Sequence, residues 1–543
     1  MLPRESPQRN QKLEERKKEI KADKSKKSLT TQHSLIKTTT HPLTHSNYSL
    51  HFKFISYLHN PKKKKPKNQM PQISYSYSYI LVLIFLNLCI NTISITHWED
   101  IQSLKHFKLG INPNSVSPGS CISTWDFSFD PCDTLSTERF TCGIRCDVAF
   151  SNVSRVTDLT LDRAGYSGSL TPNLNLPYLT TLDLTNNYFT GSIHPGSFSK
   201  LTRLTRLSLS SNSFNESIPD SVNSFPDSLE ELYLDNNNLH GPVPHSLNTL
   251  KNLKRLELQN NQLSNSLPEL TQLANLSFLD VSNNLISGEL PASFPANIIQ
   301  LTMRNNTLQG NIPANLLKDS VYLQVLDLSY NNLTGILPQE LFTHPSLQQL
   351  TLSNNFFKWV PSFAEFGSAK DRKGKNVNKR VKKEGSLFSL PRESKKLNKR
   401  VNEGGSLFSL PSESELIAID LSNNDLHGYL PVFMGYMPKL SALSLENNKF
   451  SGVIPVQYAV KAVMDMGGSG GAGELAPFER LLLGGNYLFG LIPGPLLRLR
   501  TGSDVMIELG DNCLYECPVS FYFCGGGSQK SLMECKTFSP VIP

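Results

Sequence analysis

The sequence predicts an α/β repeat protein: a solenoid with a parallel β-sheet on its concave face and a disulfide-bonded cap at each end. Two observations support this fold class. The leucine pattern LxxLxLxxNxLxGxIP recurs about twelve times between residues 156 and 493, at intervals of 22–25 residues except across two interruptions, at 362–414 and 464–474. Eight cysteines form two groups of four, one on each side of the repeats. One copy of so short a pattern cannot bury a core alone, so the copies must stack and the terminal copies need caps.

The copy at 323–338 shows the expected role of each position in the repeat. Leu326 and Leu328 alternate with polar residues, which predicts a short strand with both leucines inside. Gly335 and Pro338 predict a turn onto the convex side. The asparagine of each copy is expected to hydrogen-bond the backbone of neighbouring turns. It recurs at Asn187, Asn212, Asn237, Asn261, Asn284, Asn306, Asn331, Asn355, Asn424, Asn448 and Asn486.

Composition divides the chain into segments. The basic, low-complexity leader 1–69 carries 17 basic and 5 acidic side chains, and we expect it to be disordered or absent from the mature protein. The other segments are a signal peptide at 70–96, an N-terminal cap at 97–155, repeats one to nine at 156–361, a basic insert at 362–414, repeats ten to twelve at 415–493 with a glycine-rich loop at 464–474, and a C-terminal cap at 494–543.

The apolar run at 80–95 decides the expected location. It fits the hydrophobic region of a signal peptide that begins at Met70, and it is short for a membrane span. We therefore expect a secreted protein of the apoplast or cell wall. The alternative is a plasma-membrane protein held by 80–95 as an uncleaved signal anchor. No C-terminal membrane span is expected, because no comparable apolar run follows the repeats.

The cysteines outside the signal region predict four disulfides within the two caps. Each group has an even number of members, and the groups are separated by about a dozen strands, on the order of 50 Å, whereas bridged Cα atoms lie within about 7 Å. Zinc is disfavoured because neither group has nearby histidines or CxxC spacing, and no cofactor is expected. The two groups are Cys121, Cys132, Cys142 and Cys146, and Cys513, Cys517, Cys524 and Cys535.

The charge distribution argues against a nucleic-acid partner. The formal net charge is +7, but residues 370–403 carry 13 basic and 4 acidic side chains, and the chain outside that stretch and the leader carries 23 basic and 37 acidic. No catalytic constellation stands out, and the recurring Asp183, Asp280 and Asp327 occupy one repeat position, which is typical of a solvated row. The GxGxxG match in 464–474 lacks the βαβ context of a dinucleotide site. We expect no enzyme activity.

Arginine and aromatic side chains mark the expected ligand-binding surface. The x positions of LxxLxLxxN point to the concave face, which is the usual binding face of a solenoid. Arginines and aromatics are enriched at hot spots, and the acidic column favours a basic or mixed-charge partner. The candidate binding residues, all in repeats three to eight, are Arg206, Tyr233, Asp235, Arg255, Glu257, Phe278, Arg304 and Tyr330.

Five N-x-S/T sequons predict N-glycosylation of a secreted scaffold. One of them lies on or beside a concave strand, where a glycan would restrict the binding face to one end. The acceptor asparagines are Asn152, Asn215, Asn275, Asn305 and Asn332.

The cap motifs resemble those of plant leucine-rich repeat (LRR) receptor-like proteins and receptor kinases. The matching residues are Trp125, Asp130-Pro131-Cys132 and Cys142-Gly143-Ile144-Arg145-Cys146-Asp147 at one end, and Asn512-Cys513-Leu514 and Cys517-Pro518 at the other. The repeat length near 24 and the LxGxIP turn are also similar to this plant subclass. The resemblance implies the pairing Cys132–Cys146, with Cys121–Cys142 as the remaining pair.

The resemblance also implies a function. Such a protein would bind an extracellular peptide, protein or cell-wall ligand in signalling or defence, with a receptor kinase co-receptor or a cell-wall polysaccharide as further partner classes. No kinase activity is carried over, because no kinase sequence is present. Two alternatives remain open: a secreted inhibitor of microbial wall-degrading enzymes similar to polygalacturonase-inhibiting proteins, and a structural cell-wall protein. The insert 362–414 lies where the resembled family often carries a folded island, but its lysine-rich composition favours a disordered loop.

Overall fold

The computed structural model describes residues 95–132, 142–150, 153–221, 225–361, 414–464, 475–499, 503–518, 520–525, 528–539 and 542. The chain divides into two units, 1–83 and 84–543, and every described residue belongs to the second. The leader 1–69, the signal segment up to residue 94 and nearly all of the insert and the glycine-rich loop lie outside the described residues.

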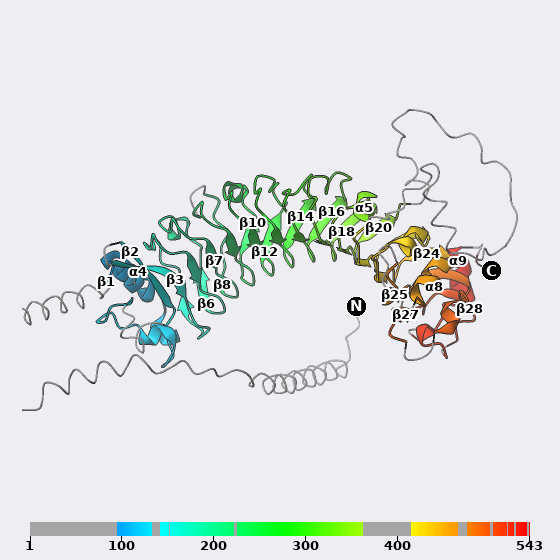
Figure 1. Cartoon of the computed structure of the whole chain (residues 1–543), viewed down its shortest axis with the longest axis horizontal. Helices are drawn as coiled ribbons and strands as arrows, with labels where there is room; N and C mark the ends of the chain where they lie inside the picture. Colours follow the sequence, from blue (N-terminus) through cyan, green and yellow to red (C-terminus); the bar gives the residue numbers. More distant parts are fainter. Residues whose placement is uncertain are drawn as a thin grey trace, which may run out of the picture. The chain divides into compact units, whose positions relative to one another are not determined.

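The predicted solenoid and its parallel sheet are confirmed. Figure 1 shows the short strands following one another along the molecule. They form one sheet in chain order, with β2 (Ile144–Phe150) paired antiparallel to β3 at the N-terminal end. The parallel strands are β1 (Ile95–Thr96), β3 (Val153–Thr160), β5 (Thr181–Asp183), β7 (Arg206–Ser208), β9 (Glu231–Tyr233), β11 (Arg255–Glu257), β13 (Phe278–Asp280), β15 (Gln300–Thr302), β17 (Val325–Asp327), β19 (Gln349–Thr351), β21 (Ala418–Asp420), β23 (Ala442–Ser444), β25 (Arg480–Leu482) and β27 (Met506–Glu508).

Each three-residue strand buries its middle residue and leaves the two flanking residues on the concave surface. In β11, Leu256 is fully buried, whereas Arg255 and Glu257 are partly exposed. The same alternation holds from β5 to β23, apart from a buried Ser208, because successive side chains of a strand point to opposite faces. The inward leucines of successive turns therefore pack into one continuous core.

The LxGx segment of most repeats forms a second set of parallel strands, where the sequence had predicted only a turn. These segments remain extended while the glycine adopts a left-handed φ, +88° at Gly335. The strands lie in three sheets: β4 (Ser167–Gly168), β6 (Tyr188–Gly191) and β8 (Ser213–Phe214); β10 (His240–Pro242), β12 (Gln262–Asn265), β14 (Leu285–Glu289), β16 (Thr307–Asn311), β18 (Asn332–Ile336) and β20 (Phe356–Trp359); and β22 (His427–Tyr429), β24 (Lys449–Gly452), β26 (Tyr487–Leu491) and β28 (Cys513–Tyr515).

Helices occur in the caps and in the connections between strands. The α-helices of the described part are α4 (Trp98–Leu109), α5 (Glu340–Thr343), α8 (Val456–Ala462) and α9 (Leu532–Phe538). Short 3-10 turns are η2 (Pro113–Ser115), η3 (Cys121–Thr124), η5 (Pro195–Ser197), η6 (His245–Thr249), η7 (Val432–Tyr436), η8 (Leu496–Arg498) and η9 (Tyr522–Cys524).

The predicted asparagine ladder is confirmed at every repeat asparagine named above. Asn331 is nearly fully buried. Its Nδ2 donates to the carbonyl oxygens of Met303, Leu328 and Ser329 at 3.0–3.2 Å, and its Oδ1 accepts from the backbone N–H of Leu308 at 3.1 Å. Asn512, after β27, makes the same set of bonds. The ladder and the sheet thus continue by one strand into the segment assigned to the C-terminal cap.

Each cap is held by two disulfides between cysteines of its own group. The structure pairs Cys121 with Cys142 and Cys132 with Cys146, as the resemblance implied. At the other end it pairs Cys513 with Cys535 and Cys517 with Cys524. All four Cα–Cα distances lie between 5.1 and 6.0 Å.

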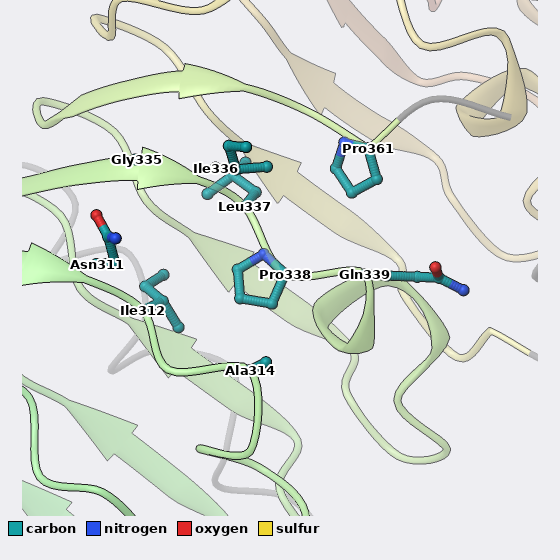
Figure 2. A pocket seen from close by; sticks show the side chains of 9 residues that line it. All are labelled: Asn311, Ile312, Ala314, Gly335, Ile336, Leu337, Pro338, Gln339 and Pro361. Carbon is teal, nitrogen blue, oxygen red and sulfur yellow. The ribbon is translucent and has the colours of Figure 1, made fainter. Parts of the chain in front are cut away.

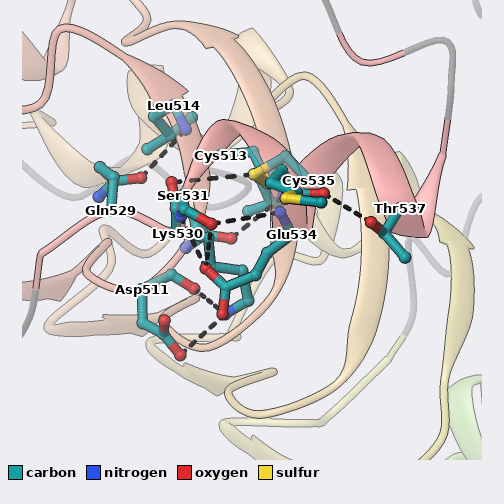
Figure 3. The surroundings of a disulfide bond; sticks show 12 residues. Asp511, Cys513, Leu514, Gln529, Lys530, Ser531, Glu534, Cys535 and Thr537 are labelled. Carbon is teal, nitrogen blue, oxygen red and sulfur yellow. Dashed lines mark hydrogen bonds and ion pairs between the residues drawn. A yellow bond between two sulfur atoms is a disulfide. The ribbon is translucent and has the colours of Figure 1, made fainter.

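The surroundings of the Cys513–Cys535 bond show why helix α9 begins where it does (Figure 3). Ser531 caps the helix, because its Oγ accepts from the N–H of Glu534 at 3.2 Å and the Glu534 carboxylate accepts from the N–H of Ser531 at 2.8 Å. Lys530 forms an ion pair with Asp511 at 2.8 Å. The helix is therefore tied to the last turn of the solenoid by a disulfide and an ion pair.

The N-terminal cap includes two residues that the sequence placed at the end of the signal segment. Ile95 and Thr96 form β1, which pairs with β3. The N–H of Thr96 donates to Asp130 at 2.8 Å, and the Thr96 hydroxyl accepts from the N–H of Cys132 at 3.0 Å. A mature chain that begins at residue 95 would retain this strand.

The solenoid is continuous across the position of the insert. Strand β19 pairs directly with β21, with Leu350 opposite Ile419. The ladder passes the same point, since Asn424 Nδ2 donates to the Leu352 carbonyl at 3.0 Å and its Oδ1 accepts from the N–H of Phe357 at 3.1 Å. The two sets of repeats on either side of 362–413 therefore form one stack.

Helix α8 contains a buried lysine that faces no carboxylate partner within hydrogen-bonding distance in the described part of the chain. Lys461 is 1% exposed. Its ammonium donates to the Met437 carbonyl and lies 5.1 Å from the ring centre of Phe478. Burial lowers the pKa of Lys461 to about 8.

We expect Lys461→Met to stabilise the C-terminal repeats near neutral pH. Below pH 8 the lysine is charged in both the folded and the unfolded chain, and the charged form carries the full cost of burial, about 3 kcal/mol. Between pH 8 and about 10.5 the unfolded chain binds more protons, so the free energy of unfolding rises with pH. Urea unfolding at pH 7 and pH 9.5 should show this rise in the native protein and lose it in the variant. The surface lysine variant Lys439→Met serves as the control, and an unchanged pH dependence in Lys461→Met would contradict the assignment.

Candidate binding surface

The structure aligns five of the candidate binding residues in columns across the concave sheet: Arg206, Tyr233, Arg255, Glu257 and Phe278. The third residues of the strands are in register, so that Tyr233, Glu257 and Asp280 are direct neighbours. The first residues form a second column, in which Arg206, Glu231, Arg255 and Phe278 follow one another. Side chains from consecutive repeats therefore meet on one surface, as the sequence predicts.

Arg206 belongs to a three-residue cluster on β7 and β9. Its guanidinium pairs with the Glu231 carboxylate, donates to the Tyr233 hydroxyl at 3.1 Å and lies 4.4 Å from the Tyr233 ring centre. The Tyr233 hydroxyl donates to Glu231 at 3.0 Å. Burial, and next the hydrogen bond to Glu231, raise the pKa of Tyr233, so that this phenol remains a neutral donor at physiological pH.

A second cluster lies two repeats further on. The Arg255 guanidinium donates to the Glu257 carboxylate at 2.8 Å and stacks on Phe278, 3.7 Å from its ring centre. The other Glu257 oxygen accepts from Gln259 at 3.0 Å. Stacking of a guanidinium on an aromatic face is favourable by about 0.5–1 kcal/mol at exposed sites, so this platform is ordered before any ligand arrives.

Asp235 is buried, unlike the other candidate residues. Its carboxylate accepts hydrogen bonds from the Ser210 hydroxyl and the Asn236 side-chain amide, and the residue is 7% exposed. Asp235 therefore joins its own turn to the turn of Ser210 and is not available to a ligand. The sequence pattern alone does not show this, because the equivalent position is buried at Ser282 and Ser329 but exposed at Arg304.

Arg304 and Tyr330 form the third arginine–aromatic pair, between the turns that follow β15 and β17. The Arg304 guanidinium lies 4.6 Å from the Tyr330 ring centre. Both residues are exposed. Within the described ranges Arg304 forms no ion pair, in contrast to Arg206 and Arg255.

The carboxylates between these pairs form an acidic row. Burial raises the pKa of Asp280, with the charges of Glu257 and Asp327 contributing and hydrogen bonds from Ser282 opposing. Further along the sheet, burial and the neighbouring Glu508 raise the pKa of Glu446. Carboxylates that raise one another's pKa favour a cationic group nearby.

Four of the five sequon asparagines are exposed, and Asn152 lies outside the described residues. Asn305 is the one beside the concave strands. Its Nδ2 donates to the Asn283 side-chain oxygen at 2.9 Å. Glycosylation at Asn215, Asn275, Asn305 and Asn332 remains a prediction.

An apolar stripe on the second set of strands was not predicted from the sequence. It consists of Ile336, Trp359, Tyr429 and Leu491 in these strands and of Val453 directly after β24, and these side chains are between 49% and 79% exposed. In earlier repeats the residue after the turn glycine position is polar, for example Ser217, Ser266 and Glu289. The change from polar to apolar at this position is the sequence signal that marks the stripe.

A shallow hollow of about 410 Å³ adjoins the apolar stripe at Ile336 (Figure 2). Its wall is mostly apolar and comes from three successive repeats. The lining residues are Asn311, Ile312, Ala314, Gly335, Ile336, Leu337, Pro338, Gln339 and Pro361.

Neither a metal site nor a membrane-spanning helix occurs in the described residues. In these ranges no group of three or more His, Cys, Asp or Glu side chains is arranged to hold a metal ion. Within the same part of the chain, no helix has the length and apolar character needed to cross a membrane.

Comparisons with known proteins agree with the repeat architecture. Family models described as leucine rich repeat match residues 174–226 and, for a second model, residues 228–250, 275–296 and 322–343. Receptor like protein 21 of Arabidopsis thaliana is 30% identical over 147 residues, which are 26% of this chain and 12% of that protein. A leucine-rich repeat receptor-like serine/threonine-protein kinase of the same plant is 39% identical over 92 residues, 15% of this chain and 9% of the kinase.

The chain therefore spans only a small part of the length of the curated relatives it matches. Among solved structures, one described as a TDR receptor has a TM-score of 0.48 and 24% identity, over 67% of this chain and 53% of that one. The family models thus identify leucine-rich repeats within residues 174–343, and the two plant receptor-like proteins are similar to this chain over 147 and 92 residues.

Proposed function

We propose that this protein is an extracellular recognition protein that binds a peptide or protein ligand on its concave face between β7 and β17. The observation that carries the proposal is the set of three arginine–aromatic pairs, Arg206–Tyr233, Arg255–Phe278 and Arg304–Tyr330. Each pair joins neighbouring repeats and remains partly exposed. Ordered arginines and aromatics of this kind are the usual energetic anchors of protein interfaces.

The chemistry of the surface favours a ligand of mixed charge. The guanidinium groups can bind carboxylates, and the acidic row of Glu257, Asp280 and Asp327 can bind amines or guanidinium groups. Four disulfides support an extracellular location, since such bonds persist in oxidising compartments. The relatives are named as a receptor-like protein and a receptor-like protein kinase, which supports a role in extracellular recognition.

The test is ligand capture by the full chain and by a variant of the second pair. The secreted protein would be cross-linked in apoplastic fluid, and the bound peptides or proteins identified by mass spectrometry. We expect the double variant Arg255→Ala/Phe278→Ala to lose the captured ligand, with at least a tenfold fall in affinity. The control is Arg203→Ala, which removes an exposed arginine outside the strands. A ligand that binds both variants and the native protein equally would contradict concave-face binding.

The two alternative functions give different results in parallel assays. Inhibition of a purified fungal polygalacturonase by the native protein, lost in the double variant, would favour the enzyme-inhibitor class. Retention of the protein in cell walls after high-salt extraction would favour a structural role. A soluble ligand captured without either effect supports the receptor-like function.

A further inference from the structure

The two aromatic side chains in the middle of the apolar stripe are held in place by glycines. A Cβ atom at Gly428 would lie 3.5 Å from the Trp359 ring, and a Cβ atom at Gly452 would collide with the Tyr429 ring, at 2.8 Å from Cε1. Each ring therefore lies against the backbone of the following repeat. Side chains that are already ordered lose little conformational entropy when a partner covers them.

The stripe is large for an exposed apolar surface. Tyr515 in β28 pairs in register with Leu491 and extends the stripe by one strand, and these six side chains are 49–79% exposed. At roughly 150–250 Å² for each aromatic side chain and less for each aliphatic one, they expose an apolar area on the order of 600 Å². The largest apolar patch of a typical monomer is about 300–600 Å², and a stable interface buries about 800 Å² of each partner. Phe356 and Tyr487, on β20 and β26, supply further apolar area.

The order of side chains along the stripe is complementary to its own reverse. Two stripes can run antiparallel with their common centre between β22 and β24. Every aromatic side chain then meets an aliphatic one of the other copy. The opposed pairs are Ile336 with Tyr515, Trp359 with Leu491, and Tyr429 with Val453.

The charges beside the centre of the stripe are complementary in the same arrangement. Asp425 and Lys449 each follow a ladder asparagine directly, in the two repeats on either side of the centre. They form an ion pair within one chain. With the strands of the two copies aligned, Asp425 of one copy faces Lys449 of the other, so that two ion pairs meet as four alternating charges.

The hollow beside Ile336 lies where the other copy presents an aromatic side chain. Pro338 and Pro361 contribute to its mostly apolar wall (Figure 2). The antiparallel arrangement places Tyr515 of the second copy opposite this hollow, once at each end of the interface. An aromatic side chain in an apolar pocket is a typical hot spot of a protein interface.

We propose that two copies of this protein associate face to face through the apolar stripe, antiparallel along the stripe and with their strands aligned. A two-fold axis between β22 and β24 relates the copies, and such an interface requires a surface that is complementary to itself. The strands that carry the candidate binding surface belong to the other sheet and take no part in the contact. This inference goes beyond the proposed function and does not depend on the ligand.

The charge of the insert favours a second copy over the insert as the group that covers the stripe. Residues 362–413 follow Pro361 directly, and the part at 370–403 carries 13 basic and 4 acidic side chains. Lys358 and Lys449 flank the stripe. Like charges oppose one another at an interface, whereas the second copy presents an aspartate to Lys449.

The first test measures the mass of the full chain by sedimentation velocity over a range of concentrations. We expect the mass to double as concentration rises, and Tyr429→Asp/Leu491→Asp to weaken association at least tenfold with an unchanged melting temperature. The control Tyr322→Asp changes a side chain that is 57% exposed outside the stripe, and it should stay within twofold of the native protein. A double variant that associates like the native chain would overturn the proposal. A native chain that is still monomeric at about 100 µM, where even a weak specific interface is populated, would do the same.

Two further measurements examine what else could cover the stripe. Deleting 362–413 should leave the association within twofold of the native value, and a monomer that becomes a dimer only on deletion would show that the insert covers the stripe instead. Asn332 lies on β18 at one end of the stripe and begins a glycosylation sequon. The native chain should therefore be compared with and without its N-glycans, and a dimer that forms only without glycans would overturn the proposal for the secreted protein.

The antiparallel arrangement is tested with single cysteines and a short thiol cross-linker. Residue 358 on β20 should face residue 491 on β26 of the other copy, whereas two copies of residue 358 should lie three strand spacings apart, about 14 Å. A mixture of Lys358→Cys and Leu491→Cys should therefore cross-link at least fivefold more than either variant alone. Equal yields, or a preference of like for like, would refute this arrangement.

Discussion

Asn331→Ala is expected to lower the free energy of unfolding of the surrounding repeats by about 3–5 kcal/mol. The side chain bonds one N–H and three carbonyl groups of two adjacent turns. Removing it leaves the buried N–H of Leu308 without its acceptor, and an unsatisfied buried group costs about 1–3 kcal/mol. Hydrogen exchange at the amides of β16 and β18, together with the urea midpoint, would measure the loss.

The neighbouring Asn332→Ala provides the control, since Asn332 is exposed. In protein made without glycans, this change should alter the free energy of unfolding by no more than about 0.5 kcal/mol. If Asn331→Ala were equally mild, the ladder would contribute little, and packing of the leucines alone would hold the turns in register.

Asp100→Ala should destabilise the N-terminal cap by about 3–5 kcal/mol, because it leaves an arginine charge unpaired in a largely buried position. Asp100 is fully buried. Its carboxylate accepts from Arg155 Nη2 at 2.7 Å, from Arg155 Nε at 3.0 Å and from the Val156 N–H at 2.9 Å. The effect should appear as local loss of hydrogen-exchange protection in α4 and β3, with the central repeats unchanged.

The double variant Asp100→Leu/Arg155→Met tests whether the cost comes from the unpaired charge. Replacing both members of a buried ion pair by apolar residues is often neutral or stabilising, so the double variant should recover most of the stability lost in Asp100→Ala. A double variant as unstable as the sum of two single variants would point instead to lost packing around Tyr178. The Arg155 guanidinium stacks on that ring, 4.5 Å from its centre.

The sequence predicts the main sheet well because one physical requirement is repeated in every turn. Alternating leucines must point inward, and a buried asparagine must satisfy the backbone of the next turn, so each copy confirms the others. The second set of strands was not predicted, because the LxGx segment is too short to alternate clearly and its glycine suggests a turn. Strand β27 (Met506–Glu508) was missed because Ile507 replaces the first leucine of the LxL pair and only Leu509 remains.

The sequence predicts which positions lie on the concave surface, but not the contacts that the side chains at these positions make. The pattern places Arg206, Arg255 and Arg304 on one face. It does not show that the first two are paired with carboxylates, whereas Arg304 forms no ion pair with any residue that the structure describes. It also does not show that Asp235 is buried, because that depends on Ser210 and Asn236 in two turns.

Because β19 pairs directly with β21, the stacking of the repeats does not depend on the chain that connects these two strands. On each side of residues 362–413, the turns meet as two complementary surfaces that share a strand pair and ladder hydrogen bonds. A chain cut within this range has the contacts needed to remain a non-covalent heterodimer of an N-terminal and a C-terminal fragment. Residues 362–413 are therefore a suitable site for splitting the protein. A reporter or a cargo domain can be inserted there without changing the leucines of the core.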